Sequence, residues 1–345
     1  MLRLPEIEYA SPKSIDEAID ILSSRGKQTM PIAGGTDTIP KIKRQQIQPD
    51  MLVDLKGISD LRGIHRTNHR VQIGALTSLS TIADSPEVQN VCPAVAQAAR
   101  MVGSSSHQRM GTIGGNICQD TRCNYYDQTK DWRESLGWCK KAPDTEGYNP
   151  EGGDSDVPCR TAPGSERCWA IFASDCAPAL IAHQAQVTII GPDGERELPL
   201  NELYTDNGMQ PVEKEQTEII TKIDIPDIES ESEYRKLRQR DSFDFPSLGV
   251  AIAINQDDEI MQSVNIVLGA VSTRPIVITE ANEILEGEPP SKERIEKAAN
   301  IAKGEARPMD NDDISPAYRN RMTGVYTRRT LTNLIESNFS GFDDD

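Results

Sequence analysis

Four cysteine residues in the middle of the chain carry the side chains best suited to bind a metal: Cys123, Cys139, Cys159 and Cys168. They lie in a polar stretch with little helical or strand periodicity. Four thiolates would suit zinc or an iron–sulfur cluster, and either would order a long irregular loop. No two of them form a C-x-x-C pair, so scattered unliganded thiols stay open as the alternative.

The other three cysteines have different surroundings. Cys92 and Cys176 lie in the apolar stretches VCPAVAQAAR and SDCAPALIAH, which predicts small buried hydrophobic residues. Cys118 lies only five positions before Cys123, close enough in sequence to replace one of the four ligands.

Two Gly-Gly turns offer a second kind of chemistry. Residues 31–37 read PIAGGTD and follow a predicted strand directly, and residues 111–116 read GTIGGN. Glycine at such turns lets backbone N–H groups approach a phosphate without an intervening Cβ atom. Neither stretch is a G-x-G-x-x-G or a Walker A motif. Tight turns and a nucleotide site therefore both stay open as interpretations.

The elements that would position these residues predict an α+β protein. A capping box of Ser14 and Glu17 begins a helix, and Pro316 begins another after its cap Ser315. Helices are expected at residues 14–26, 291–306 and 315–337, with two more within 78–103. Strands are expected at 29–35, 50–55, 70–76, 186–200 (a hairpin), 218–226, 249–255 and 263–279. The acidic run DIESESEY places a domain boundary near residue 228.

Composition limits the partners of the protein. The chain has 345 residues and a net charge of −17, which argues against binding to nucleic acid or to an anionic membrane surface. Its first residues, MLRLPEIEYASPKSIDEA, lack the apolar core of a signal peptide, and no stretch is apolar enough to cross a bilayer. We therefore expect a cytoplasmic protein.

At the glycine turns the chain resembles a known family over essentially its whole length. The FAD-binding medium subunits of the molybdenum hydroxylases, which include xanthine dehydrogenase and carbon monoxide dehydrogenase, have segments similar to PIAGGTDTIPKIKRQQIQPDMLVDL, GTIGGNICQD and SDCAPAL. The resemblance implies an FAD domain of the vanillyl-alcohol-oxidase type over residues 1–228, with a small part at 1–58 and a larger part at 59–228. The larger part would hold the cysteine-rich loop, residues 118–170. A C-terminal α+β domain like that of the carbon monoxide dehydrogenase flavoprotein would cover residues 229–345.

The same resemblance implies which residues contact the cofactor. The first turn would wrap the FAD pyrophosphate with Ile32, Ala33, Gly34, Gly35, Thr36 and Asp37. The second turn would lie on the cofactor through Thr112, Gly114, Gly115 and Asn116. Asp175 would bind on the ribityl or adenosine side, and Arg238 would lie close to the flavin.

The cysteine-rich loop sets this chain apart from most of that family and resembles the medium subunit of 4-hydroxybenzoyl-CoA reductase. That resemblance implies a 4Fe–4S cluster on Cys123, Cys139, Cys159 and Cys168. The separations of 16 and 9 positions match, whereas the connection from Cys139 to Cys159 is longer here. Because loop-closure entropy grows only logarithmically with length, a longer bulge between ligands is tolerable.

The function implied is electron transfer by one subunit of a larger enzyme. Its partners would be a large subunit with the molybdenum cofactor, a small subunit with 2Fe–2S centres and a ferredoxin-like carrier, assembled as a dimer of heterotrimers. The alternatives are an FAD subunit of an aldehyde oxidoreductase or xanthine dehydrogenase, a stand-alone flavin reductase, and a zinc-stapled binding protein.

Overall fold

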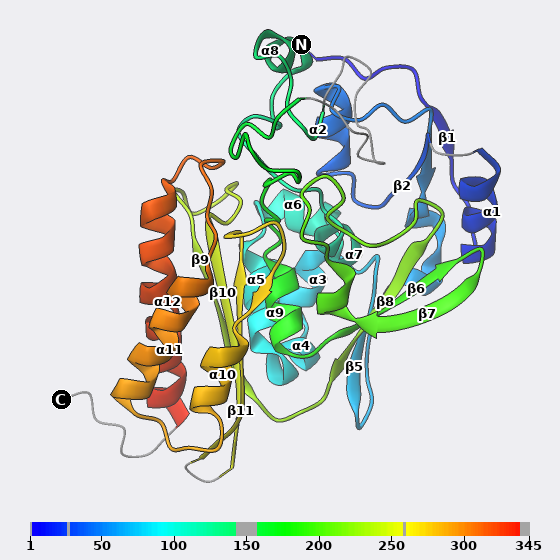
Figure 1. Cartoon of the computed structure of the whole chain (residues 1–345). Coiled ribbons are helices and arrows are strands. Elements are labelled where there is room, and N and C mark those ends of the chain that lie inside the picture. Colours follow the sequence, from blue (N-terminus) through cyan, green and yellow to red (C-terminus); the bar gives the residue numbers. More distant parts are fainter. Residues whose placement is uncertain (1, 26–27, 143–156, 258–259, 339–345) are drawn as a thin grey trace.

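Three β-sheets and the helices packed on them make up the described part of the chain. The computed structural model describes residues 2–25, 28–142, 157–257 and 260–338 (Figure 1). The predicted α+β class is confirmed. Among the described residues, no helix combines the length and the apolar character that crossing a membrane requires.

The first sheet is parallel and carries the first glycine turn at one end. Its strand order is β1-β3-β2, with bounds Glu8–Ala10 (β1), Met51–Asp54 (β3) and Thr29–Ile32 (β2). Helix α1 (Ile15–Arg25) buries Ala18 and Leu22 in the same apolar cluster as Val53 of β3. Ser14 Oγ accepts the backbone N–H of Glu17 at 3.2 Å, as the capping pattern predicts. The glycine turn leads from β2 into helix α2 (Thr38–Lys43).

The second sheet is antiparallel and has five strands in the order β4-β5-β8-β6-β7. The bounds are Ile64–Arg66 (β4), Arg70–Gly74 (β5), Ile219–Pro226 (β8), Gln186–Gly191 (β6) and Gly194–Pro199 (β7). Short 3-10 helices lie at Leu55–Gly57, Ser59–Leu61 and Leu200–Leu203. The helices beside this sheet are α3 (Leu79–Asp84), α4 (Pro86–Val91), α5 (Pro93–Met101), α6 (Ser105–Met110), α7 (Ile113–Ile117) and α9 (Cys176–Ala182).

Residues 78–103 form three helices where two are predicted. Pro86 and Pro93 each stand at the first position of a helix, where the missing N–H and the fixed φ of proline are tolerated. A proline cannot continue the preceding helix, so each one starts a new helix.

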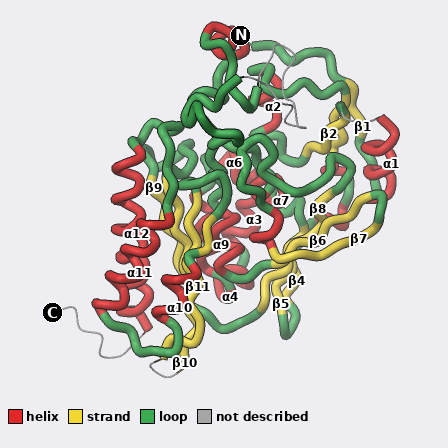
Figure 2. The backbone as a smooth tube through the Cα atoms, in the orientation of Figure 1, coloured by secondary structure: helices red, strands yellow, loops and turns green. Residues whose placement is uncertain are grey.

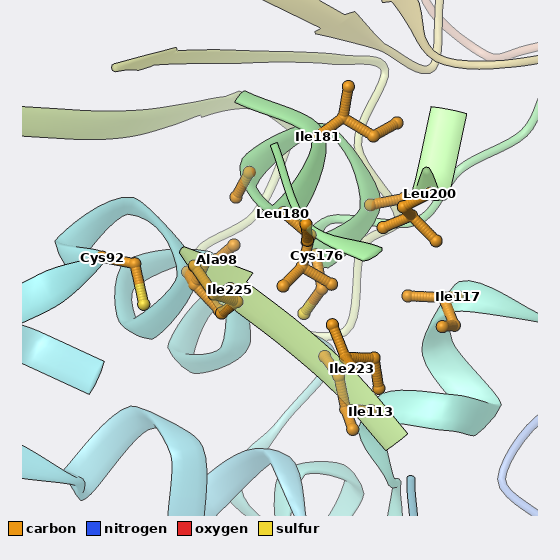
Figure 3. Packing of buried hydrophobic residues seen from close by; sticks show 14 of the residues in the cluster. Cys92, Ala98, Ile113, Ile117, Cys176, Leu180, Ile181, Leu200, Ile223 and Ile225 are labelled. Atoms are coloured by element: carbon orange, nitrogen blue, oxygen red, sulfur yellow. The ribbon is translucent and has the colours of Figure 1, made fainter. Parts of the chain in front are cut away.

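The main core lies between these helices and the second sheet (Figure 3). Cys92 and Cys176 are buried there among aliphatic side chains such as Leu180 and Ile225, as their apolar sequence surroundings predict.

The third sheet is antiparallel, with the order β12-β11-β10-β9. Its strands are β9 (Glu231–Leu237), β10 (Leu248–Asp257), β11 (Ile260–Gly269) and β12 (Ile276–Val277). Helices α10 (Thr279–Leu285), α11 (Lys292–Glu305) and α12 (Pro316–Asn338) pack on one face, and α9 packs on the other (Figure 1). The centre of the sheet is thus buried on both sides, which explains the nearly continuous apolar sequence at the start of β10.

The cysteine-rich segment contains one helix among the described residues, α8 (Lys130–Ser135), and otherwise forms loops and turns (Figure 2). It lies at the same end of the molecule as α2 (Figure 1). Residues 143–156 are outside the described residues. The longer connection predicted between Cys139 and Cys159 falls largely there.

Candidate functional site

The two glycine turns lie in direct contact although they are far apart in sequence. A Cβ atom on Gly34 would lie 2.1 Å from the carbonyl oxygen of Met110 and 2.9 Å from Cα of Gly111. Only glycine permits this approach. Gly35 has a φ of +71°, in the left-handed region that glycine adopts without strain. The structure therefore brings the two predicted cofactor loops together at one place.

The backbone N–H groups of the two turns differ in what they bind. Among the residues that the structure describes, no acceptor takes a hydrogen bond from the N–H groups of residues 33–37. In the second turn, Gly114 N–H donates to the carbonyl of Ala75 at 2.8 Å, and Gly115 N–H donates to Oγ1 of Thr112 at 3.1 Å. The first turn is thus the one that offers donors to an anion, and the second acts as its support.

A loop from the C-terminal part of the chain lies beside the glycine turns. Arg122 Nη1 lies 3.2 Å from Oδ1 of Asp37, and its guanidinium stacks 3.8 Å from the ring centre of Phe245. Phe243, from the same loop, packs edge-on against His107 with ring centres 5.2 Å apart. Phe243 and Phe245 both remain exposed. Arg122 therefore links Phe245 of this loop to Asp37 of the first turn, and Phe243 packs on α6.

Asn116 and Asp175 have their side chains engaged by the protein itself. Asn116 Oδ1 accepts from Ser174 Oγ at 2.7 Å and from the N–H of Cys176 at 3.2 Å. Asn116 thereby fixes the start of α9 against the second glycine turn.

Asp175 accepts from the hydroxyl of Tyr234 at 2.8 Å and from Nζ of Lys236 at 3.0 Å. Burial raises the pKa of Asp175 although the charges of Lys236 and Arg238 oppose the rise. Arg238 is half-buried. Asp175 thus joins the start of α9 to β9 of the third sheet.

The four cysteines predicted to bind metal line one small cavity. Cys123, Cys139, Cys159 and Cys168 are all buried free thiols. About 250 Å³ between them is unfilled by protein atoms, including open solvent at the mouth, and about 10 Å³ of it admits the centre of a water molecule. An occupant larger than water therefore requires the thiols to rotate outward. Cys118 instead packs against the main core.

Backbone N–H groups lie close to sulfur atoms of the cavity. The N–H of Ala170 donates to Sγ of Cys168 at 3.4 Å. Backbone N–H groups of Tyr125 and of Ala142 and Lys141 favour the charged form of Cys123 and Cys139 respectively, which lowers the pKa of these thiols against the effect of burial. Such donors stabilise sulfur that carries negative charge, and hydrogen bonds of this kind tune iron–sulfur clusters.

Burial is the main influence on the pKa of two of these thiols, and a mutual hydrogen bond is the main influence on the other two. Burial raises the pKa of Cys123 to about 12 and also raises the pKa of Cys139. Cys168 donates a hydrogen bond to Cys159, which lowers the pKa of Cys159 and raises that of Cys168. Within the described residues, no three His, Cys, Asp or Glu side chains are placed to hold a single metal ion. The thiols therefore line a cavity rather than converge on one point.

A half-buried carboxylate shared by two buried lysines lies between the thiol cavity and the first glycine turn. Asp120 accepts from Nζ of Lys41 at 2.9 Å through one oxygen and from Nζ of Lys141 through the other. Lys141 Nζ also donates to the carbonyl of Gly208 at 2.6 Å. Burial opposes the ionisation of Asp120, but the two lysines hold its pKa well below the usual range. Sequence analysis missed this group, because no local pattern marks it.

Arg133 docks the cysteine-rich segment on α2. This side chain is 1% exposed, and its Nη2 donates to the carbonyl of Gln45 at 2.7 Å, just beyond the end of the helix. Gln46 Nε2 donates to the carbonyl of Tyr126 at 3.0 Å. In the described part of the chain, Nε and Nη1 of Arg133 have no hydrogen-bond partner. The segment that holds the thiols therefore also holds the helix that follows the first glycine turn.

A larger cavity of about 410 Å³ lies elsewhere, between α5, β9 and α12. None of the predicted site residues lines it. Its lining residues are Gln97, Met101, Glu233, Tyr234, Arg235, Lys236, Tyr326 and Arg329.

Two family models match the chain. The FAD binding domain in molybdopterin dehydrogenase matches residues 5–228, and the CO dehydrogenase flavoprotein C-terminal domain matches residues 232–334. The chain is similar to the carbon monoxide dehydrogenase medium chain of Hydrogenophaga pseudoflava, with 26% identity over 95% of this chain and 96% of the relative. It is also similar to the nicotinate dehydrogenase FAD-subunit of Eubacterium barkeri, with 24% identity over 97% and 96%.

Solved structures show the same fold. Carbon monoxide dehydrogenase from Hydrogenophaga pseudoflava, in a form that lacks the Mo-pyranopterin moiety, matches with a TM-score of 0.78 and 24% identity. The match covers 97% of this chain and 99% of that chain. Quinoline 2-oxidoreductase from Pseudomonas putida 86 matches with a TM-score of 0.75 and 19% identity, over 97% and 99%.

Proposed function

We propose, from the premise that this chain belongs to the FAD-binding medium subunits of the molybdenum hydroxylase family, that it relays electrons through FAD and a second, iron–sulfur centre. The family makes the chain an FAD-binding oxidoreductase subunit. The proposal adds to this assignment an iron–sulfur centre, the partner subunits and the substrate.

The first glycine turn is the proposed binding site of the FAD pyrophosphate. The observation that supports it is the run of backbone N–H groups at residues 33–37, which no acceptor in the described part of the chain occupies. Successive N–H groups of this kind form an anion-binding concavity. Arg122 holds Asp37 at the end of the turn, and the second turn supports Gly34 from behind. When bound, FAD exchanges one or two electrons.

Arg238 and the exposed ring of Phe245, which stacks on Arg122, are proposed to lie beside the flavin. Asn116 and Asp175 are proposed to act on the cofactor by holding α9 and β9 in place. The proposed domain division is residues 1–58, 59–228 and 229–345, and it puts the two glycine turns on either side of the first boundary.

The thiol cavity is the proposed site of a 4Fe–4S cluster. The observation that supports this part is that four buried free thiols line one cavity, where the N–H of Ala170 donates to Sγ of Cys168. Four cysteine thiolates are the usual ligands of such a cluster, which transfers one electron at a time when bound. Cys123, Cys139, Cys159 and Cys168 would hold it, and Tyr126 and Lys141 would shield it from water.

The proposed complex resembles 4-hydroxybenzoyl-CoA reductase, with a large molybdenum subunit and a small 2Fe–2S subunit. A ferredoxin-like carrier, a dimer of heterotrimers and a cytoplasmic location complete this proposal. An FAD subunit of an aldehyde oxidoreductase or xanthine dehydrogenase is the second candidate. It is favoured by the similarity to the putative xanthine dehydrogenase FAD-binding subunit XdhB of Escherichia coli, which is 21% identical over 95% of each chain.

Metal and flavin analysis of the purified full chain tests the proposal. We expect about one FAD, four irons and four acid-labile sulfides per chain, together with a low-temperature paramagnetic signal after reduction. FAD without iron would leave the family assignment intact and remove the cluster. Zinc in place of iron would support the alternative of a binding protein whose loop is held together by zinc. Co-purification from the native host identifies the partner subunits, whose substrate pocket decides between the two candidates.

A further inference from the structure

Two chains of polar contacts connect the thiol cavity to the first glycine turn, and both end on α2. In the first, Lys141 lines the cavity and binds Asp120, which also binds Lys41 within α2. The second starts at Cys123, whose N–H donates to Oδ2 of Asp127 at 3.1 Å.

The second chain continues from Asp127 to the cap of α2. Arg122 Nη2 lies 3.3 Å from Oδ1 of Asp127, and its Nη1 lies 3.2 Å from Oδ1 of Asp37. Asp37 is both the last residue of the proposed pyrophosphate loop and the residue that precedes α2. The two chains therefore hold the helix at its start and at its middle.

The two lysines of the first chain of contacts are buried, which strengthens the interaction of their charges with Asp120. The side chains of Lys41 and Lys141 are 3% and 1% exposed, so solvent and salt screen their charges weakly. Both ammonium groups lie close to the ring of Tyr126, at 4.8 Å and 4.9 Å from its centre. The charges of the connected ion pairs cancel: three cations, Lys41, Lys141 and Arg122, balance three carboxylates, Asp37, Asp120 and Asp127.

We propose that the Lys141–Asp120–Lys41 contacts couple the thiol cavity to the first glycine turn, so that a negatively charged thiolate-bound centre in the cavity tightens FAD binding. This inference rests on the proposed function. A tetrathiolate centre adds negative charge beside Lys141 and competes with Asp120 for that ammonium group. Asp120 then binds Lys41 more strongly, which fixes α2 and the turn that leads into it. Fixing the turn in advance lowers the cost of ordering it around the FAD pyrophosphate.

Thermodynamic linkage makes the inference measurable. If the cavity occupant strengthens FAD binding by some factor, FAD strengthens retention of the occupant by the same factor. We expect about a tenfold effect, which corresponds to about 1.4 kcal/mol.

The experiment measures the FAD dissociation constant of the full chain, by ultrafiltration, in two forms. One form is loaded anaerobically with iron and sulfide, and the other is stripped with a chelator under reducing conditions. The loaded wild type is expected to bind FAD about tenfold more tightly. In Lys41→Met the ratio between the two forms should fall below about twofold. Lys43→Met is the matched control, because Lys43 lies on the same helix with an exposed side chain, and it should keep the wild-type ratio.

Three outcomes decide the matter. Equal FAD affinity of the loaded and stripped wild type overturns the coupling, and so does a Lys41→Met variant that keeps the full ratio. A wild type that binds no iron, or no FAD, refutes the proposed function instead. If thermal unfolding shows that Lys41→Met does not fold, Asp120→Asn provides the same comparison, because it removes the shared charge and retains an oxygen acceptor.

Discussion

Lys236 of β9 in the third sheet binds Asp175 at the start of α9. Their Nζ and Oδ2 atoms are 3.0 Å apart, and the two side chains are 1% and 4% exposed. Lys236 Nζ also donates to the carbonyl of Met101 at 3.0 Å, and Asp175 accepts from Tyr234. One buried ion pair thus joins α5, α9 and β9, and the remaining polar atoms around it are satisfied.

Lys236→Met should destabilise the protein strongly, because it leaves the carboxylate of Asp175 buried without its cation. Breaking a buried pair from one side costs about 3–5 kcal/mol, measured as the free energy of unfolding in urea. The double variant Asp175→Asn/Lys236→Met should recover part of this loss.

Lys222→Met is the control for this prediction. Lys222 pairs with Glu197 at 3.7 Å on the surface, with the two side chains 31% and 47% exposed. Its replacement should cost less than about 1 kcal/mol. Similar losses for the two single variants would mean that burial of the Asp175 pair has no special consequence.

Gly34→Ala should separate the two glycine turns. Its Cβ would lie 2.1 Å from the carbonyl oxygen of Met110, so the backbone must move. We expect the purified variant to contain less than about a tenth of the wild-type FAD, because loop geometry sets the pyrophosphate site. Flavin absorbance after denaturation measures this content.

Gly304→Ala serves as the control for Gly34→Ala. Gly304 lies in α11, where an added Cβ meets no atom of a neighbouring element within 4 Å, so this substitution should leave the FAD content unchanged. Full FAD content in Gly34→Ala would remove the contact between the turns from the cofactor site.

Cys139→Ser should abolish iron binding, whereas Cys118→Ser should retain it. Cys139 lines the cavity, but Cys118 packs against the main core, where burial raises its pKa to about 11. Iron analysis and the low-temperature paramagnetic signal of the reduced protein measure the difference. Loss of iron from Cys118→Ser with retention in Cys139→Ser would replace the proposed ligand set.

Local patterns in the sequence predict the elements well and the contacts between them poorly. The strand before the first glycine turn, the capping box at Ser14 and the last helix beginning at Pro316 each depend on neighbouring residues, and each is found. The α+β fold and the membership of the flavoprotein family are confirmed. The contact of Gly34 with Met110 depends on how two sheets pack, which neither turn encodes alone.

The buried charges show the same limit. Lys41 and Asp120 are 79 positions apart, and nothing in the sequence distinguishes Lys41 from exposed Lys43 two residues later. For Asp175, the sequence marks the residue but not its partner. Its segment, SDCAPAL, marks the family, yet the partner of its side chain, Lys236, becomes apparent only when the third sheet is in place. From a sequence alone, charged residues are expected at the protein surface, because burying a charge without a partner is costly.

The pH dependence of stability should depend on His183, which lies at the end of α9. Burial lowers its pKa from 6.5 to about 4, and its Nε2 lies 2.8 Å from Oγ of Ser232. Well above pH 6.5 the side chain is neutral in the folded and unfolded chains alike. As the pH falls from about 6.5 towards 4, the unfolded chain binds a proton that the folded chain does not, so the free energy of unfolding decreases. The full decrease in the free energy of unfolding is about 3 kcal/mol.

Urea unfolding at several pH values should therefore show a smaller decrease in this free energy for His183→Gln than for the wild type. The exposed variant His69→Gln should follow the wild type. An identical pH profile for His183→Gln and the wild type would contradict the buried neutral imidazole, because the carboxylates contribute equally to both proteins.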